Sequence, residues 1–184
     1  PLINYSQGTY RLKAGNKSFD FGNDFYYADA PPRLDFTSDE IVFAGYGITD
    51  SLSGWNDYNG IDVKGKTVLI LEGEPMNKKG YSLISKTKSP SVWVSNRSTK
   101  INLAKKMQAA AILIMVNDYI GNFDRYNRRM EYGRLEVDNE ANAKVIPVIY
   151  VNKTAVTFIL NAAGKDLAVF EKNAGKHKGK NGMV

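Results

Sequence analysis

The stretch Gly65-Lys66-Thr67-Val68-Leu69-Ile70-Leu71 decides the fold of this 184-residue chain. From Thr67 to Leu71 the residues are β-branched or aliphatic, which is typical of a strand that a sheet buries on both faces. A second run of this kind, Ile112 to Val116, follows a segment with helical periodicity. Buried strands that alternate with helices indicate parallel crossover units. The sequence therefore predicts an α/β fold.

Downstream of the first strand, the spacing predicts a helix over 98–110, with Ser98-Thr99 as its cap. The segment 117–143 is polar and rich in Tyr, Arg and Asn, which indicates a long loop; such loops are usually functional or mobile. A third strand is expected over 144–151. Its Pro147 favours an edge or an irregular position, because proline cannot donate to a sheet ladder.

After the third strand, Asn152 is expected to cap a last helix. Inward positions of that helix are Val156, Ile159, Leu160 and Ala163. Gly164 is expected to end it, as glycine commonly does just beyond a helix.

Upstream, residues 9–21 alternate like a hairpin, and Glu40 to Gly47 form a β-rich run that ends in glycines. The hairpin beside parallel units predicts a mixed sheet with flanking helices. We expect one domain over 1–171 and a basic Lys/Gly tail over 172–184. That tail holds four lysines and no acid, so it carries most of the net charge of +6.

The composition limits the chemistry that this chain can perform. It contains no cysteine, which excludes disulfides, thiolate zinc sites and cysteine nucleophiles. Its one histidine, His177, lies in the Lys/Gly tail, where nothing would orient it as a catalytic base or zinc ligand. Glu72 and Glu74 are expected to be solvated carboxylates at a strand end. We therefore predict that this chain alone is not an enzyme and carries no cofactor or metal.

Several short motifs occur in a definite order. Gly45-Tyr46-Gly47-Ile48 ends the early strand, and Trp55-Asn56-Asp57-Tyr58 follows it. Next come Gly60-Ile61-Asp62-Val63-Lys64-Gly65-Lys66 and, after the buried strand, Gly73-Glu74-Pro75. Ile146-Pro147-Val148-Ile149 comes last. Gly45-Tyr46-Gly47 lacks the third glycine of a dinucleotide fingerprint, so its glycines are interpreted as turn residues.

This ordered set, spread from about Leu12 to Glu171, resembles the protease-associated (PA-like) domain of di-zinc aminopeptidases. That peptidase family includes glutamate carboxypeptidase-like and bacterial exported aminopeptidases. One departure is Ala109 or Ala110, where the family has glycine before its second buried strand.

The resemblance implies a swivelling β/β/α fold inserted beside a catalytic domain that binds two zinc ions. It implies a non-catalytic lid that gates or helps to bind peptide substrate, with the catalytic domain in cis as its partner. It also implies a periplasmic, cell-surface or extracellular location. No stretch of this chain matches the catalytic domain, so no zinc ligand is carried over.

A lid needs polar and aromatic groups on loops that a rigid sheet supports. Candidates for contact with substrate or partner are Tyr46, Trp55, Asn56, Tyr58, Asn117, Asp118, Tyr126 and Arg128. The alternative for Trp55 and Tyr58 is that they staple their loop to the sheet. The stretch 75–106 has eight Lys/Arg and no acid. Its members Lys86, Lys88 and Arg97 are candidates for attracting carboxylates, or else they form an ordinary solvated face.

Two further classes of function fit the same residues. A freestanding protein- or glycan-interaction module would use the same loops without a peptidase. A nucleic-acid binder would use the basic stretch, but the chain has no nucleic-acid-binding motif. No apolar run is long enough to span a bilayer. We therefore expect no nucleic acid among the partners and no membrane span in this chain.

Overall fold

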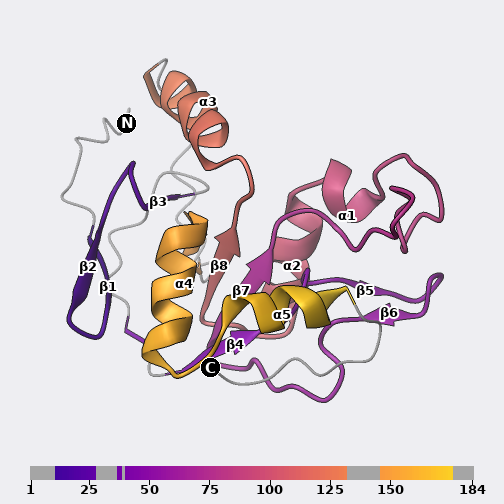
Figure 1. The fold of residues 1–184 in the computed structure, drawn as a ribbon, viewed down its shortest axis with the longest axis horizontal. Coiled ribbons are helices and arrows are strands. Elements are labelled where there is room, and N and C mark those ends of the chain that lie inside the picture. The colour runs from indigo at the N-terminus through magenta and orange to yellow at the C-terminus, as the bar shows by residue number, and fades with distance from the viewer. Residues whose placement is uncertain (1–10, 28–36, 39, 132–145, 176–184) are drawn as a thin grey trace, which may run out of the picture.

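The computed structural model describes residues 11–27, 37–38, 40–131 and 146–175, with side chains omitted at 129–131. Figure 1 shows its elements. In chain order they are β1 (Arg11–Ala14), β2 (Lys17–Asp20), β3 (Phe25–Tyr27), β4 (Ile41–Phe43), β5 (Thr49–Asp50), β6 (Trp55–Asn56), β7 (Thr67–Leu71), α1 (Val92–Ser95), α2 (Ser98–Lys106), β8 (Ala111–Met115), α3 (Tyr119–Glu131), β9 (Val148–Val151), α4 (Lys153–Ala162) and α5 (Leu167–Ala174).

A five-stranded sheet in the order β3-β9-β8-β7-β4 forms the centre of the molecule. β4, β7, β8 and β9 run parallel, whereas β3 is antiparallel to β9. Every residue of β7 and β8 is buried, as their apolar sequences predict. The predicted hairpin is present as β1 and β2, which pair separately from the main sheet. The prediction of a mixed α/β fold is confirmed.

Helices cover both faces of this sheet, with α4 and α5 in front of it and α2 behind it in Figure 1. Because successive side chains of a strand point to opposite faces, the strands divide their residues between two cores. Leu69 and Leu113 pack with α4 and α5 on what we call the α4–α5 face. Val68 and Ile112 pack with α2 and α3 on what we call the α2–α3 face.

α4 begins as the sequence predicts, whereas α5 was not predicted. The Asn152 side chain accepts the backbone N–H of Ala155 at 2.7 Å and so caps α4. Gly164 follows the end of that helix with a φ of +69°, a conformation that glycine adopts readily. Val156, Ile159 and Leu160 are buried as expected. Ala163 is exposed, so its predicted inward position is wrong, because α4 has already ended there.

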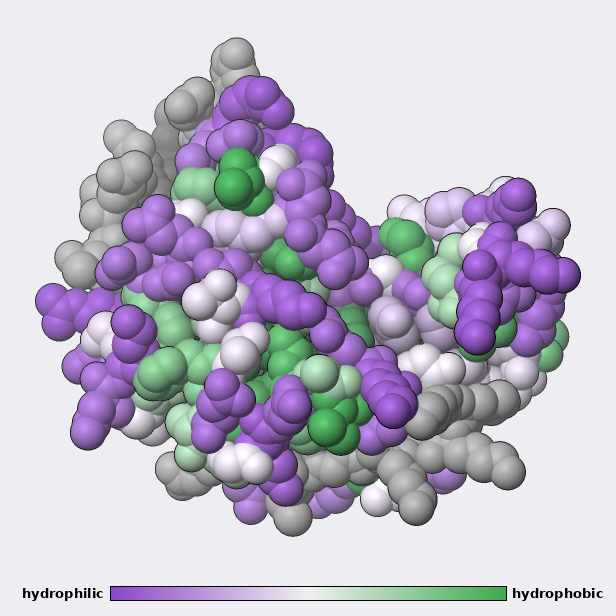
Figure 2. All heavy atoms as spheres, viewed as in Figure 1, coloured by the Kyte–Doolittle hydropathy of each residue, from purple (hydrophilic) through white to green (hydrophobic). Residues whose placement is uncertain are grey.

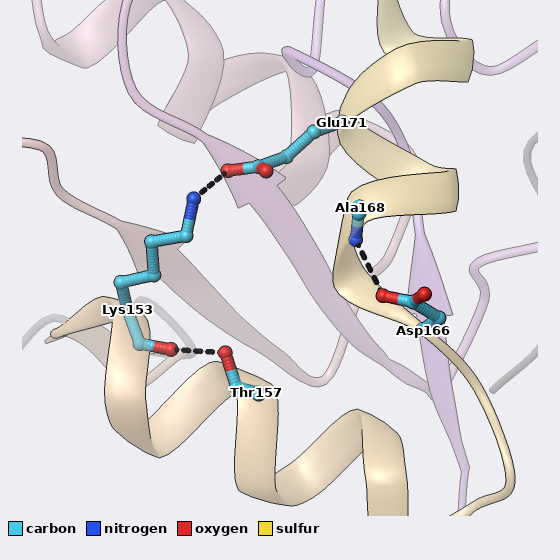
Figure 3. A network of polar contacts seen from close by, with 5 residues as sticks. All are labelled: Lys153, Thr157, Asp166, Ala168 and Glu171. Atoms are coloured by element: carbon cyan, nitrogen blue, oxygen red, sulfur yellow. Dashed lines mark hydrogen bonds and ion pairs between the residues drawn. The ribbon is translucent and has the colours of Figure 1, made fainter.

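Figure 3 shows an ion pair that joins α4 to α5 and the hydrogen bond that caps α5. The Lys153 ammonium lies 2.7 Å from the Glu171 carboxylate, and Asp166 caps α5 by accepting the Ala168 N–H at 2.8 Å. α5 continues through Lys172 to Ala174, which is buried. The expected tail at 172 therefore begins three residues too early. Residues 176–184, His177 included, lie outside the described residues.

The predicted cap of α2 is wrong. The residue before the helix is Arg97, whose side chain makes no capping hydrogen bond. Asn96 serves instead, because its Oδ1 accepts the Ser98 N–H at 3.1 Å. The helix also ends at Lys106 rather than near Ala110, and Gln108 turns the chain with a φ of +62°.

The polar segment after β8 forms a helix and not the predicted loop, at least to Glu131. Asp118 starts α3 by accepting the Gly121 N–H at 3.1 Å. Tyr119, Phe123 and Tyr126 then recur at helical spacing and pack around Tyr26 of β3. An aromatic stripe therefore buries one face of a helix whose composition is otherwise polar. Residues 132–145 lie outside the described part of the chain.

The third predicted strand is shorter than expected, and its edge position is wrong. β9 lies between β3 and β8, inside the sheet. Pro147 stands immediately before the strand, and its carbonyl accepts the Ile112 N–H at 2.9 Å. Because Pro147 precedes β9, the sheet loses no hydrogen bond through the missing proline N–H. Pro147 thus takes an irregular position, the alternative to an edge position that the sequence analysis named. No helix within the described residues is long and apolar enough to cross a membrane.

Candidate functional site

A cavity of about 180 Å³ opens on the α2–α3 face, near the edge where the parallel strands end. α1 and α2 form one wall, and β8 and β9 contribute the floor. The lining residues are Glu72, Gly73, Trp93, Val94, Arg97, Lys100, Ile114 and Tyr150. Figure 2 shows the surface hollowed between the part that carries α3 and the part that carries α1. Ligands of open α/β sheets bind outside the carboxyl ends of the strands, which makes this cavity the candidate site.

Lys100 is the most deeply buried charge of the cavity, with 6% of its surface exposed. Its Nζ donates hydrogen bonds to the carbonyls of Gly73 and Leu71, the latter at 3.3 Å. Burial lowers the pKa of this amine to about 8, although the carboxylates of Asp57, Glu74 and Glu72 act in the opposite direction. The first turn of α2 thus places a buried amine, mostly protonated at neutral pH, against the end of β7.

Arg97 is held at the cavity by the neighbouring helix and strand. Its Nη2 donates to Asn122 Oδ1 at 3.0 Å, and Arg125 Nη2 donates to the same oxygen at 2.7 Å. The guanidinium carbon lies 6.0 Å from the centre of the Tyr150 ring, within the range of a cation–π contact. One buried amide of α3 therefore fixes the guanidinium of Arg97, just before α2, beside the sheet.

The two carboxylates after β7 differ in surroundings. Glu72 lines the cavity and accepts the backbone N–H of Asn117 through Oε2 at 2.9 Å. Glu74 is buried and accepts hydrogen bonds from the Ser82 hydroxyl at 2.8 Å and the Ser91 N–H at 2.9 Å. The expectation that both are solvated is therefore wrong for Glu74, which fastens the following loop to the start of α1.

The Gly45-Tyr46-Gly47 motif forms a turn around the buried carboxylate of Asp57. Oδ2 of Asp57 accepts the N–H groups of Tyr46 at 3.1 Å and Ile48 at 3.0 Å. A Cβ at Gly45 would approach Asp57 Oδ1 to 2.6 Å, so the turn excludes other residues there. Burial raises the pKa of Asp57 to about 6, against hydrogen bonds from Ile48, Trp55 and Tyr46.

The structure separates the predicted contact residues. Trp55 and Tyr58 are buried, which agrees with the alternative that they staple their loop to the sheet. Tyr126 is buried among the aromatic residues of the α2–α3 face. Tyr46 is half-buried, with its ring 5.8 Å from Lys100 Nζ. The exposed members are Asn56, Asn117, Asp118 and Arg128, none of which lines the cavity.

Of the three predicted steering residues, Arg97 alone lines the cavity. Lys86 donates to the Leu83 carbonyl at 2.5 Å, and Lys88 lies 5.5 Å from the centre of the Tyr81 ring. Both lysines are exposed in the loop before α1. The structure does not gather the acid-free stretch into one cationic site.

The sequence reasoning missed Lys100, Trp93 and Tyr150 as cavity residues. A signal for Lys100 was available, because it precedes Ala104 by four residues and so lies on the apolar stripe of α2. A lysine within such a stripe indicates a buried amine. Trp93 and Tyr150 meet at the cavity only through tertiary packing, which no local pattern records.

Among the described residues, no three His, Cys, Asp or Glu side chains are grouped closely enough to hold a metal ion. Comparisons of the chain with protein-family models, with curated proteins and with solved structures found no match.

Proposed function

We propose that this chain is a PA-like domain of the swivelling β/β/α type that serves as the non-catalytic lid of an exported zinc aminopeptidase. In this role it gates or helps to bind the peptide substrate. Its partners are the catalytic domain in cis and the peptide. The two zinc ions belong to the catalytic domain, and the protein works in the periplasm, at the cell surface or outside the cell.

The observation that carries this proposal is the position of the cavity relative to the motifs. Glu72 and Gly73 follow β7 and line the cavity, while Tyr46 of the early turn lies beside Lys100. Two of the segments on which the family resemblance rests, residues 45–48 after β4 and residues 73–75 after β7, thus lie at the carboxyl end of the sheet, where the cavity opens. A rigid sheet with aromatic and cationic groups at that end is suited to contacting a peptide.

The first test compares the full-length product of the gene with this chain alone. We expect zinc and aminopeptidase activity only in the full-length protein. Deleting the domain should then change the ratio of cleavage rates for long and short peptides. An unchanged ratio, or zinc and activity in this chain alone, would contradict the proposal. A reading frame without His-x-Asp, Glu-Glu and a late His would favour the freestanding interaction module.

A point substitution guards against a deletion that merely unfolds the enzyme. In the full-length protein, Arg97→Glu should slow cleavage of acidic peptides at low ionic strength, because it reverses a charge at the cavity. Lys105→Glu makes the same charge change at an exposed position of α2, the helix that follows Arg97, and should leave the rate unchanged. Equal rates for both variants would remove the cavity from substrate contact.

A further inference from the structure

The cavity combines charges of both signs in a small volume. Lys100 and Arg97 supply cations, and Glu72 supplies a carboxylate whose field reaches the Lys100 amine. A ligand with only negative charge would be repelled by Glu72, and a ligand with only positive charge would be repelled by Lys100 and Arg97. A buried charge is tolerated when it is paired. The lining therefore favours a ligand that carries both charges.

Donors for a carboxylate are present in the lining of the cavity. A protonated lysine has three N–H donors, and the carbonyls of Leu71 and Gly73 take two from Lys100. Arg97 uses one nitrogen to hold Asn122, and its guanidinium has further donors. Arginine and lysine hydrogen bonds to a carboxylate are among the stronger ones in proteins.

An acceptor for an ammonium is present in the same lining. Glu72 uses Oε2 to accept the Asn117 N–H, and no described residue donates a hydrogen bond to its Oε1. The Trp93 and Tyr150 rings line the same cavity, and aromatic faces attract cations.

The remaining lining sets the size and polarity of the ligand. Val94 and Ile114 add aliphatic surface to that of the two aromatic rings. The volume of about 180 Å³ is below the roughly 300–1,000 Å³ of sites for drug-sized ligands. A single amino acid with a medium-sized apolar side chain fits these limits.

We infer that the cavity binds a free α-amino acid with an apolar side chain, its carboxylate on Lys100 and Arg97 and its ammonium on Glu72. All of these groups belong to this chain, so binding requires no catalytic domain and goes beyond the proposed lid role. Failure of amino-acid binding would leave the lid role to its own test.

The experiment is calorimetric titration of the 184-residue chain with L-leucine, N-acetyl-L-leucine and L-leucinamide. The acetylated compound lacks the ammonium, and the amide lacks the carboxylate. We expect leucine to bind about tenfold more tightly than either one, since each leaves a charged group of the cavity unpaired. No binding of leucine at millimolar concentration would overturn the assignment. Equal affinity for N-acetyl-leucine would reduce the cavity to an anion site and overturn it too, as would equal affinity for leucinamide.

Two variants assign the ends of the ligand. Glu72→Gln should weaken leucine binding about tenfold without weakening that of N-acetyl-leucine. Arg97→Gln should weaken leucine binding and leave leucinamide unaffected. Lys105→Gln, at an exposed position of α2, is the matched control and should bind leucine as the parent chain does. Thermal unfolding of each variant verifies its fold, and the ligand series on the parent chain decides the question if a variant unfolds.

Discussion

The two faces of the central sheet are built differently, although the same strands form both. On the α4–α5 face, Phe43, Leu69 and Leu160 are fully buried in an apolar core. The buried polar residues that the structure describes include none from α4 or α5. On the α2–α3 face, the buried polar residues include Lys100 and Asn122, and the candidate cavity opens beside them. One face therefore stabilises the fold by packing, whereas the other combines packing with charged groups held for contact.

The largest expected effect is the loss of a core side chain from the α4–α5 face. Phe43 is fully buried, and its ring lies 4.8 Å from that of Phe170. Phe43→Ala should lower the free energy of unfolding by about 3–5 kcal/mol, because it removes apolar burial and leaves a void. Urea denaturation measures this. Val169→Ala, at an exposed position of α5, should change stability by less than about 0.5 kcal/mol. Similar losses for both variants would show that this face is not the packed core described.

The buried carboxyl of Asp57, in the turn after β4, should instead make stability depend on pH. Burial raises the pKa of Asp57 from 3.8 to about 6. The folded state therefore binds a proton more tightly than the unfolded state does. The stabilisation is fully present below pH 3.8 and is lost as pH rises through about 6. At about 1.4 kcal/mol per pKa unit, the loss amounts to roughly 3 kcal/mol.

The measurement compares the parent chain with Asp57→Asn, which mimics the neutral carboxyl at every pH. Between pH 4 and 7 the parent chain should lose stability relative to the variant. Asn152→Ala, which introduces no titrating group, should differ from the parent chain by a constant amount over that range. Parallel curves for all three proteins would mean that the Asp57 charge is not penalised by its surroundings.

This contrast between the faces explains which elements the sequence could predict. β7 and β8 were predicted because a strand buried on both faces must be apolar at every residue. The α4 cap was predicted because Asn152 acts on the N–H of a residue three positions away. α3 was missed because its aromatic stripe is diluted by arginines and asparagines. The PA-like fold itself stays a prediction.

The candidate site was predicted in part. Arg97 was identified from charge, but Lys86 and Lys88, chosen for the same reason, lie away from the cavity. Charge along the chain does not reveal which basic residues converge. Lys100 was detectable in principle, since its helical register places it with buried residues. The meeting of Trp93 with Tyr150 depends on how α1 packs against β9, and that is a property of the tertiary structure.

A smaller effect is expected at the start of α4. Asn152→Ala removes the acceptor of the Ala155 N–H and the donor to the Asn23 carbonyl. Loss of such a cap should cost about 1 kcal/mol, and at most about 2 kcal/mol. Asn161→Ala, at an exposed position near the end of the same helix, is the control and should have little effect on urea stability. If Asn161→Ala were the more destabilising variant, the cap would not be the feature that starts α4.

The smallest expected effect is at the ion pair between α4 and α5 (Figure 3). Lys153 is 64% exposed and Glu171 33% exposed, so water screens their attraction across 2.7 Å. A double-mutant cycle with Lys153→Ala and Glu171→Ala should give a coupling of about 0.2–1 kcal/mol. The coupling should fall as salt is added. The Thr157 hydroxyl donates a hydrogen bond to the Lys153 backbone carbonyl. Lys153→Ala retains that carbonyl, so this hydrogen bond does not contribute to the measured coupling. A coupling well above this range that resists salt would mean that an ion pair, and not packing alone, holds α5 on the α4–α5 face, and the contrast between the two faces would weaken accordingly.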